Sequence, residues 1–443
     1  MSRLLIAQKT NAALQGEMQP PGDKSISHRI IMLGALAEGI TEVRGWLAGE
    51  DNVATAEMML AMGAKIEWLS DDRTSLRITG VGLHGLCEPQ TILEAGNSGT
   101  CARLMLGILA AQNFHCIMQG DHSLCKRPML RVISPLRAMG AHIDGCDQGS
   151  RLPIAIRGQH LKGMHYDSPV ASAQVKSCVL LAGLFAEGKT SVTEPRPTRD
   201  HTERMLPLFG QPVAVEGNTI TIEPTGSLVA PQDVVDVPSD PSSCCFFAVA
   251  ASLIPNSCLR MKNIGMNDRR DGWRRILLDM GADISLENER LLGDEPVADI
   301  VVRYSPLHGV HVNPADVPDA IDEFPVLFVA ASLASGEFVL SGAEELRVKE
   351  SDRISVMVNA LKAVGANVEE RPDGVCITGQ PTLAGNADID ANGDHRIAMA
   401  MAIAAQCAEQ AVRISGAETI ATSFPMFVSL AKEVGMTIEW SNT

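Results

Sequence analysis

The feature that most constrains this chain is an internal repeat. A glycine that ends an amphipathic run and precedes an alternating β-rich stretch recurs six times, 70 to 84 residues apart. The six copies contain Gly63, Gly140, Gly210, Gly281, Gly365 and Gly435. A glycine at such a place supplies the left-handed residue that ends a helix, and alternation of apolar and polar residues is typical of a strand. Each copy therefore predicts an amphipathic helix followed by a strand.

A second pattern recurs with the same period. A polar cluster opens an apolar run too uniform for a half-exposed helix, and a helix that is apolar on nearly all sides belongs in a core. The six runs start at Lys24, Gly99, Ser172, Ser242, Asp322 and His395. Six repeats of roughly 74 residues, each with a buried helix, a strand, an amphipathic helix and further strand, account for the whole chain. The repeats predict an α/β protein.

Six repeats form two groups of three more naturally than one ring. Two stretches of weak pattern, Pro21–Asp23 and Asp236–Ser243, are the candidate seams between two domains. The alternative is that both are ordinary proline-containing turns.

The composition limits the partners and the compartment. The net charge is −16, which argues against a broad nucleic-acid or anionic-membrane surface, because phosphate neutralisation needs clustered Lys and Arg. The eleven cysteines include no zinc-type spacing, so we expect free thiols in a reducing cytosol. The N-terminus has too short an apolar stretch for a signal peptide, and no run reaches the roughly 18 apolar residues of a membrane helix. We expect a cytoplasmic protein with no membrane partner.

Polar residues concentrate at the starts of the six buried runs. Helix capping explains Ser172 and Thr100, since side-chain oxygens satisfy the free N–H groups of a first turn. It does not explain Lys24, Arg29, Arg103 or Arg396, because a cation at a helix N-terminus opposes the helix dipole. Buried cations need anionic partners. Helix N-termini that converge together with Arg and Lys predict a pocket for anions.

Two other basic clusters agree with such a pocket. One carries Lys126, Arg127 and Arg131, and the other carries Lys349, Glu350 and Arg353 within about one helical turn. An acid among cations could move a proton while the cations hold a charged substrate. The alternative for the second cluster is a solvated charge run with pairs such as Glu345–Lys349. P-loop, Rossmann, HExxH and GxSxG motifs are absent from the sequence.

Six motifs, taken together and in order, resemble those of the 5-enolpyruvylshikimate-3-phosphate (EPSP) synthases. They are PGDKSISHR, AGNSGTCARLM, KRPMLRV, SAQVKS, LRVKESDR and GDHRIAM, and they span essentially the whole chain. TRDHTERML, IDEFP and ATSFP are more similar to the divergent branch called class II.

The resemblance implies a fold of two similar domains, each with three βαβαββ repeats whose helices are buried, an inside-out α/β barrel. Residues 1–22 plus 243–443 would form one domain and residues 23–242 the other, with the active site in the cleft between them. It also implies transfer of the enolpyruvyl group of phosphoenolpyruvate to the 5-hydroxyl of shikimate 3-phosphate, with release of phosphate, in chorismate and aromatic amino-acid synthesis. No metal or other cofactor, no nucleic acid and a monomer are expected.

The resemblance also assigns residue roles. Asp322 would accept the 5-hydroxyl proton, Glu350 would protonate the methylene carbon, and Lys24 and His395 would assist. The residues implied for shikimate 3-phosphate are Lys24, Ser25, Arg29, Ser172, Gln174, Arg199, Asp322 and Lys349. Those implied for phosphoenolpyruvate are Lys24, Gly99, Arg127, Gln174, Arg353 and Arg396. Asp51, Asn97 and Thr100 would support them.

The sequence departs from the common family pattern at two places. Thr422 stands where many members carry a lysine, and Pro195–Arg199 stands where the common branch carries a tyrosine. Gly99 lies where some herbicide-tolerant members have alanine, and a methyl group there would crowd the phosphoenolpyruvate site, so Gly99 predicts sterically open access for the family inhibitor glyphosate. The resemblance to the class II branch points the other way, so sensitivity to glyphosate stays open at this point.

Two rival functions stay open at this point. The sister enzymes that transfer enolpyruvyl to a UDP-amino sugar carry a reactive cysteine in a Gly-rich loop, whereas Cys125 here lacks such flanks and is expected to be inert. A catalytically inactive anion-binding protein is the other rival, and the presence of both Asp322 and Glu350 argues against it.

Overall fold

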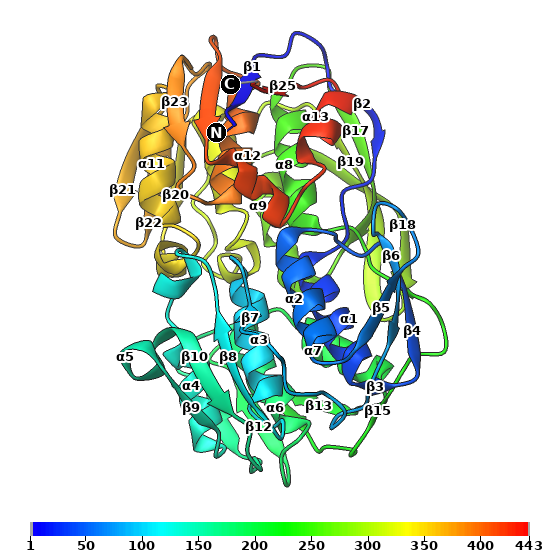
Figure 1. Ribbon diagram of the computed structural model, residues 1–443. Helices are drawn as coiled ribbons and strands as arrows, with labels where there is room; N and C mark the ends of the chain where they lie inside the picture. Colours follow the sequence, from blue (N-terminus) through cyan, green and yellow to red (C-terminus); the bar gives the residue numbers. More distant parts are fainter. Residues whose placement is uncertain (1–2, 442–443) are drawn as a thin grey trace. The chain divides into compact units, whose positions relative to one another are not determined.

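The computed structural model describes residues 3–441 (Figure 1). The chain forms two compact units. The continuous unit runs from Gly22 to Val237, and the split unit combines the segment up to Pro21 with the chain from Pro238 onward.

Three sheets of the continuous unit share one strand order. In each, the first two strands are parallel, and the last strand of the repeat pairs antiparallel with the second and third. The first sheet has β16 (Val235–Asp236), β4 (Ile40–Arg44), β6 (Ser75–Thr79) and β5 (Lys65–Trp68). The second has β7 (Leu93–Glu94), β8 (His115–Gln119), β10 (Arg151–Arg157) and β9 (His142–Gly145), and the third has β11 (His165–Asp167), β12 (Thr190–Thr193), β14 (Thr219–Ile222) and β13 (Val213–Glu216). The first sheet takes its first strand from the end of the unit.

Each repeat of this unit contributes a buried helix and a more exposed one. The buried helices are α1 (Lys24–Leu36), α3 (Gly99–Leu109) and α6 (Ala173–Gly183), and the others are α2 (Glu50–Ala61), α4 (Leu130–Ala138) and α7 (His201–Leu208). Shorter elements are β3 (Ala37–Glu38), β15 (Leu228–Val229), α5 (Cys146–Gly149) and η1 (Leu124–Lys126).

The split unit repeats this plan with the N-terminal segment inserted into it. Its sheets contain β2 (Gln15–Met18), β17 (Cys258–Gly265), β19 (Glu295–Arg303) and β18 (Asp283–Leu292); β20 (Glu337–Leu340), β22 (Gly374–Thr378) and β21 (Asn367–Arg371); and β23 (Ala387–Asp390), β24 (Val412–Ser415), β1 (Leu5–Gln8) and β25 (Thr437–Trp440). Strand β1 lies between β24 and β25 and pairs antiparallel with both, while β2 pairs in parallel with β17. The N-terminal segment therefore completes two sheets whose other strands come from the second half of the chain.

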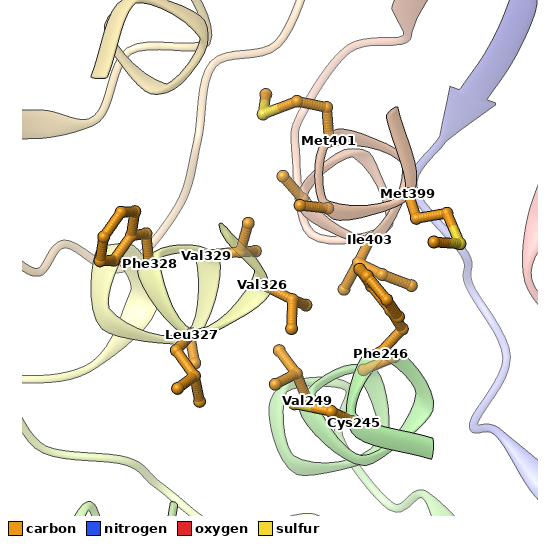
Figure 2. Packing of buried hydrophobic residues seen from close by; sticks show 14 of the residues in the cluster. Cys245, Phe246, Val249, Val326, Leu327, Phe328, Val329, Met399, Met401 and Ile403 are labelled. Carbon is orange, nitrogen blue, oxygen red and sulfur yellow. The ribbon is translucent and has the colours of Figure 1, made fainter. Parts of the chain in front are cut away.

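The helices of the split unit follow the same alternation. They are α8 (Pro241–Leu253), α9 (Gly272–Asp279), α10 (Phe324–Leu333), α11 (Arg353–Ala363), α12 (His395–Ala405) and α13 (Phe427–Glu433), with 3-10 turns η2 (Asp268–Arg270), η3 (Pro318–Ala320), η4 (Glu344–Val348) and η5 (Ala417–Thr422). Figure 2 shows α8, α10 and α12 side by side, with Val249, Val326 and Ile403 pointing into the space between them. These helices are buried on nearly all sides, as their uniform apolar runs predict.

The structure confirms the predicted fold class and the predicted helix stops. All six repeat glycines have φ between 81° and 106°, in the left-handed region, directly after an amphipathic helix. Both units contain three copies of the βαβαββ arrangement with helices inside. Because the buried helices cannot expose polar side chains along their length, polar groups are left at their ends.

Candidate functional site

Three buried helices of the continuous unit begin at capped N-termini. The side chains of Asp23, Ser98 and Ser172 accept hydrogen bonds from the backbone N–H groups of Ile26, Cys101 and Val175. These three donors lie in the first turns of α1, α3 and α6. Capping by Ser172 is confirmed. Capping by Thr100 is wrong, because Ser98 takes that role and the Thr100 hydroxyl instead accepts a hydrogen bond from Gln174 Nε2 at 3.0 Å.

Lys24 and Arg29 are held on α1 by different kinds of partner. Lys24 Nζ forms an ion pair with Asp51 on α2. Arg29 is buried and donates from Nε to Thr202 Oγ1 (2.7 Å), from Nη1 to the Ser25 carbonyl (2.9 Å) and from Nη2 to Ser177 Oγ (2.8 Å). These contacts fix the guanidinium one turn inside the helix.

Arg103 and Arg127 meet at Gly99. A Cβ atom at Gly99 would lie 3.1 Å from Arg103 Nη1 and 3.3 Å from Arg127 Nη1. Both arginines are buried, and Arg103 sits one turn into α3 whereas Arg127 follows η1. Two guanidinium groups over a helix N-terminus form a site for an anion.

Polar side chains hold these two arginines in place. Arg103 Nη1 donates to Gln174 Oε1 at 2.5 Å, and Arg127 Nη2 donates to Asn97 Oδ1 at 2.7 Å. Asn97 Nδ2 in turn donates to Asp121 Oδ2 at 2.6 Å. The structure thus brings Asn97, Gly99, Thr100, Arg127 and Gln174 together from three separate motifs. Lys126, by contrast, is exposed.

The segment before Arg199 is tied to a buried charge cluster. Lys176, 2% exposed, contacts Glu194 Oε2 at 2.7 Å and Glu203 Oε1 at 2.6 Å. The Thr198 N–H donates to Glu194 Oε2 at 3.2 Å, which fixes the backbone next to half-buried Arg199. Burial raises the pKa of Glu203, and the Lys176 charge opposes this shift. Lys176 lies in the SAQVKS motif but was not among the residues expected from the sequence.

In the split unit, one guanidinium joins three carboxylates. Arg353, 1% exposed at the start of α11, donates from Nη1 to Asp322 Oδ1 (3.1 Å), from Nη2 to Glu350 Oε2 (2.6 Å) and from Nε to Asp394 Oδ2 (2.8 Å). The negative charges of the three carboxylates raise the pKa of Arg353, while its burial opposes the shift. The candidate base and the candidate acid therefore share one buried cation.

Lys349 belongs to the same group. Its Nζ lies 3.3 Å from Asp322 Oδ1. The neighbouring Arg347 instead binds Asp352 and Glu370 at 2.8 and 3.0 Å, so it anchors the turn before α11. The LRVKESDR cluster is thus a structured site and not a solvated charge run.

Arg396 begins a second chain of contacts near Asp322. Its Nη1 donates to the Asp322 carbonyl at 2.8 Å and lies 3.6 Å from Glu323 Oε1. Glu323 accepts a hydrogen bond from Ser242 Oγ, and Arg270 Nη2 donates to the same hydroxyl at 2.8 Å. His395 is buried as the first residue of α12.

Sequence reasoning missed the carboxylates that hold these cations. Asp394 caps α12 and binds Arg353, and Glu323 is the residue after Asp322. Both lie inside the motifs GDHRIAM and IDEFP, but a motif does not determine which of two adjacent side chains points into the protein and contacts the cation. Thr422 is buried in η5 and donates to the Thr419 carbonyl at 2.7 Å, so its hydroxyl serves the local turn.

Two features are absent from residues 3–441. Within that range, no group of three or more His, Cys, Asp or Glu side chains could hold a metal ion. None of the helices in the same range is long and apolar enough to cross a membrane.

Known proteins are similar to this chain over nearly its whole length. The family model for EPSP synthase (3-phosphoshikimate 1-carboxyvinyltransferase) matches residues 8–430. The chain belongs to the EPSP synthase family. The 3-phosphoshikimate 1-carboxyvinyltransferase of Methylococcus capsulatus is 53% identical, with 97% of each chain covered, and that of Acidithiobacillus ferrooxidans is 51% identical, with 99% of each covered. A solved EPSP synthase structure from Acinetobacter baumannii is 48% identical, covers both chains fully and gives a TM-score of 0.88.

Membership in the EPSP synthase family confirms the resemblance inferred from the six motifs. It removes the inactive binding protein and the UDP-amino-sugar enzyme as leading interpretations, because full-length relatives at about 50% identity share one named activity.

Proposed function

We propose that the two groups of side chains carry out the reaction of the EPSP synthase family. In that reaction the enolpyruvyl group of phosphoenolpyruvate is transferred to the 5-hydroxyl of shikimate 3-phosphate, and phosphate is released, as a step of aromatic amino-acid synthesis. The observation that carries the residue assignment is the convergence of Asp322 and Glu350 on Arg353, at 3.1 and 2.6 Å. It supplies a base and an acid beside a fixed positive charge.

The continuous unit would bind the anionic groups. Lys24, Ser25, Arg29, Ser172, Gln174 and Arg199 are assigned to shikimate 3-phosphate, and Lys24, Gly99, Arg127 and Gln174 to phosphoenolpyruvate. The cluster of Arg103 and Arg127 over Gly99 supports an anionic ligand at that helix start. We add Arg103 to the site, because it holds the Gln174 amide at 2.5 Å.

The split unit would supply the proton transfers, and its Arg353 and Arg396 the remaining contacts to phosphoenolpyruvate. In the addition step, Asp322 takes the proton of the 5-hydroxyl, and the oxygen forms a bond to C2 of phosphoenolpyruvate. The π electrons of the C2–C3 double bond take a proton from Glu350 at C3. In the elimination step, the Glu350 carboxylate takes a proton back from C3, the double bond re-forms, and the C2–O bond to phosphate breaks with its electron pair on the phosphate. Lys349 would orient the shikimate hydroxyls, and His395 would assist Glu350.

The contacts of Arg353 suggest how Glu350 becomes an acid. An adjacent guanidinium stabilises the ionised form of a carboxyl group. When the carboxylate of phosphoenolpyruvate binds Arg353, it competes with Glu350 for that charge, so proton binding by Glu350 becomes easier. Substrate binding would in this way prepare the proton donor.

The remaining properties concern compartment, assembly and cofactors. We propose a cytoplasmic monomer that needs no metal or organic cofactor and binds no nucleic acid. The net charge of −16 supports the last point, because a polyphosphate partner would be repelled over most of the surface.

Substitution of Glu350 by Gln tests the assignment of the proton donor. Turnover should fall by about two to four orders of magnitude, the usual contribution of a positioned acid, while shikimate 3-phosphate binding is kept. Exposed Glu344→Gln, in the turn before Glu350, is the control and should keep normal turnover. Near-normal turnover of Glu350→Gln would remove Glu350 from the mechanism.

Phosphate release with two acceptors tests the substrate. Activity is expected with shikimate 3-phosphate and phosphoenolpyruvate, and none with UDP-N-acetylglucosamine in its place. Phosphate release with UDP-N-acetylglucosamine but not with shikimate 3-phosphate would assign the chain to the sister reaction.

A further inference from the structure

We propose that Glu323 is a positioning residue that acts through Arg396, and that it sets the geometry of the phosphoenolpyruvate contact. Glu323 lies directly before α10, whose apolar residues are buried. Its side chain is 1% exposed, so its charge must be balanced by nearby cations or hydrogen bonds.

One carboxylate oxygen of Glu323, Oε1, makes the contacts to both neighbouring side chains. Oε1 accepts from Ser242 Oγ and lies 3.6 Å from Arg396 Nη1. Oε2 is buried and has no hydrogen-bond partner within residues 3–441. A buried carboxylate with an open oxygen is costly unless a neighbouring cation compensates it. Arg396 is the cation that forms an ion pair with Glu323.

A second layer fixes the position of Glu323. Ser242 Oγ, which Glu323 holds, also accepts from Arg270 Nη2 at 2.8 Å, and the same Nη2 donates to Asp240 Oδ1 at 2.9 Å. Arg270 and Ser242 are both buried, on η2 and α8. Glu323 is therefore held through Ser242 by contacts from α8 and η2, independently of Arg396.

The other contact of Arg396 makes this positioning specific. Its Nη1 donates to the carbonyl of Asp322, the residue before Glu323. The same dipeptide thus provides the candidate base, a carbonyl that accepts a hydrogen bond from Arg396, and a carboxylate oxygen 3.6 Å from the Arg396 guanidinium. A shift of the Arg396 guanidinium by about 1 Å is enough to lower the rate about a hundredfold in a site of fixed geometry.

Positioning and charge compensation predict opposite changes in phosphoenolpyruvate affinity when Glu323 is substituted. If Glu323 only screened the positive charge of Arg396, its neutralisation would strengthen phosphoenolpyruvate binding. If it positions Arg396, removal of its charge or shortening of its side chain weakens binding. Glu323→Gln keeps the shape and removes the charge, and Glu323→Asp keeps the charge and withdraws it by one methylene.

The experiment measures steady-state kinetics of the full chain with each substrate varied in turn. For both Glu323→Gln and Glu323→Asp we expect a rise of about tenfold or more in KM for phosphoenolpyruvate, with KM for shikimate 3-phosphate changed less than twofold. Exposed Glu337→Gln, on β20, is the matched control and should change neither KM. An unchanged or lower KM for phosphoenolpyruvate in Glu323→Gln would overturn the positioning role, and parallel changes in both KM values would indicate a merely structural one.

Because this role depends on the proposed function of Arg396, Arg396→Lys is measured alongside. If Arg396→Lys leaves KM for phosphoenolpyruvate unchanged, the proposed function of Arg396 fails. If it raises that KM and Glu323→Gln does not, only the positioning role fails. In the Arg396→Lys background, Glu323→Gln should raise KM for phosphoenolpyruvate by less than a further factor of two. A rise as large as in the parent chain would show that Glu323 acts independently of Arg396.

Discussion

In the proposed function, Gly99 leaves room for a ligand because it has no side chain. The two guanidinium ends that face its Cα belong to residues far apart in sequence, Arg103 on the same helix and Arg127 after the next strand. Both are ends of long side chains held by hydrogen bonds and not by backbone, so we expect a methyl group to disturb the proposed anion site more than the fold.

Gly99→Ala tests this. The methyl carbon would lie 3.1 and 3.3 Å from the two guanidinium groups, which must then move. We expect KM for phosphoenolpyruvate and the inhibition constant of glyphosate to rise by about tenfold, equivalent to about 1.4 kcal/mol of overpacking. Gly265→Ala, whose added Cβ meets atoms only at 3.6 Å or more, is the control. An unchanged inhibition constant would refute the steric argument.

At the scale of elements, α1 is joined to its neighbours by a buried neutral histidine. His28 Nδ1 lies 2.7 Å from Thr55 Oγ1 on α2, and Nε2 lies 3.4 Å from Ser98 Oγ, the cap of α3. Burial, together with the positive charges of Lys24 and Arg29, holds the pKa of His28 well below its usual value of about 6.5. The helix start that carries Lys24 and Arg29 therefore packs best when His28 is uncharged.

This pKa predicts the pH dependence of stability. The unfolded chain binds a proton at His28 below about pH 6.5 and the folded chain does not, so the free energy of unfolding decreases as pH falls below that value. The decrease is at most about 1.4 kcal/mol per pH unit for this group. Urea unfolding between pH 7 and 5 gives the free energy of unfolding at each pH. This free energy should change less with pH in His28→Gln than in the parent chain, whereas exposed His142→Gln should match the parent. Equal slopes for His28→Gln and the parent would exclude His28 as the source.

At the scale of the molecule, the chain crosses between the two units twice. The continuous unit closes its first sheet with its own β16, whereas the last sheet of the split unit is closed by β1 from the other end of the chain. Leu5 and Ala7 on β1 are fully buried in the core of the split unit. The two units therefore differ in what they need in order to fold.

Fragments test this difference. Residues 22–237 should fold alone and unfold cooperatively in urea. Residues 238–443 should not, because β24 and β25 lose the strand between them, and a peptide of residues 1–21 should restore folding. Circular dichroism with urea titration gives the readout. Cooperative unfolding of residues 238–443 without the peptide would contradict the essential role of β1.

The amino-acid sequence by itself determined the repeat, the buried helices and the positions of their polar ends. These are local properties, because periodicity and a left-handed glycine act within a few residues. The same motifs supplied the family and most of the residues that the structure groups, such as Gly99 with Arg127 and Asp322 with Arg353.

Only the tertiary structure decided which side chains meet. It made Ser98 and not Thr100 the cap of α3, set Asp394 beside Arg353, and fixed Glu323 between Ser242 and Arg396. Each of these contacts joins residues from different repeats or decides between near neighbours in one motif. Such choices depend on strand order and helix packing across the whole unit, and a pattern read along the chain does not contain that information.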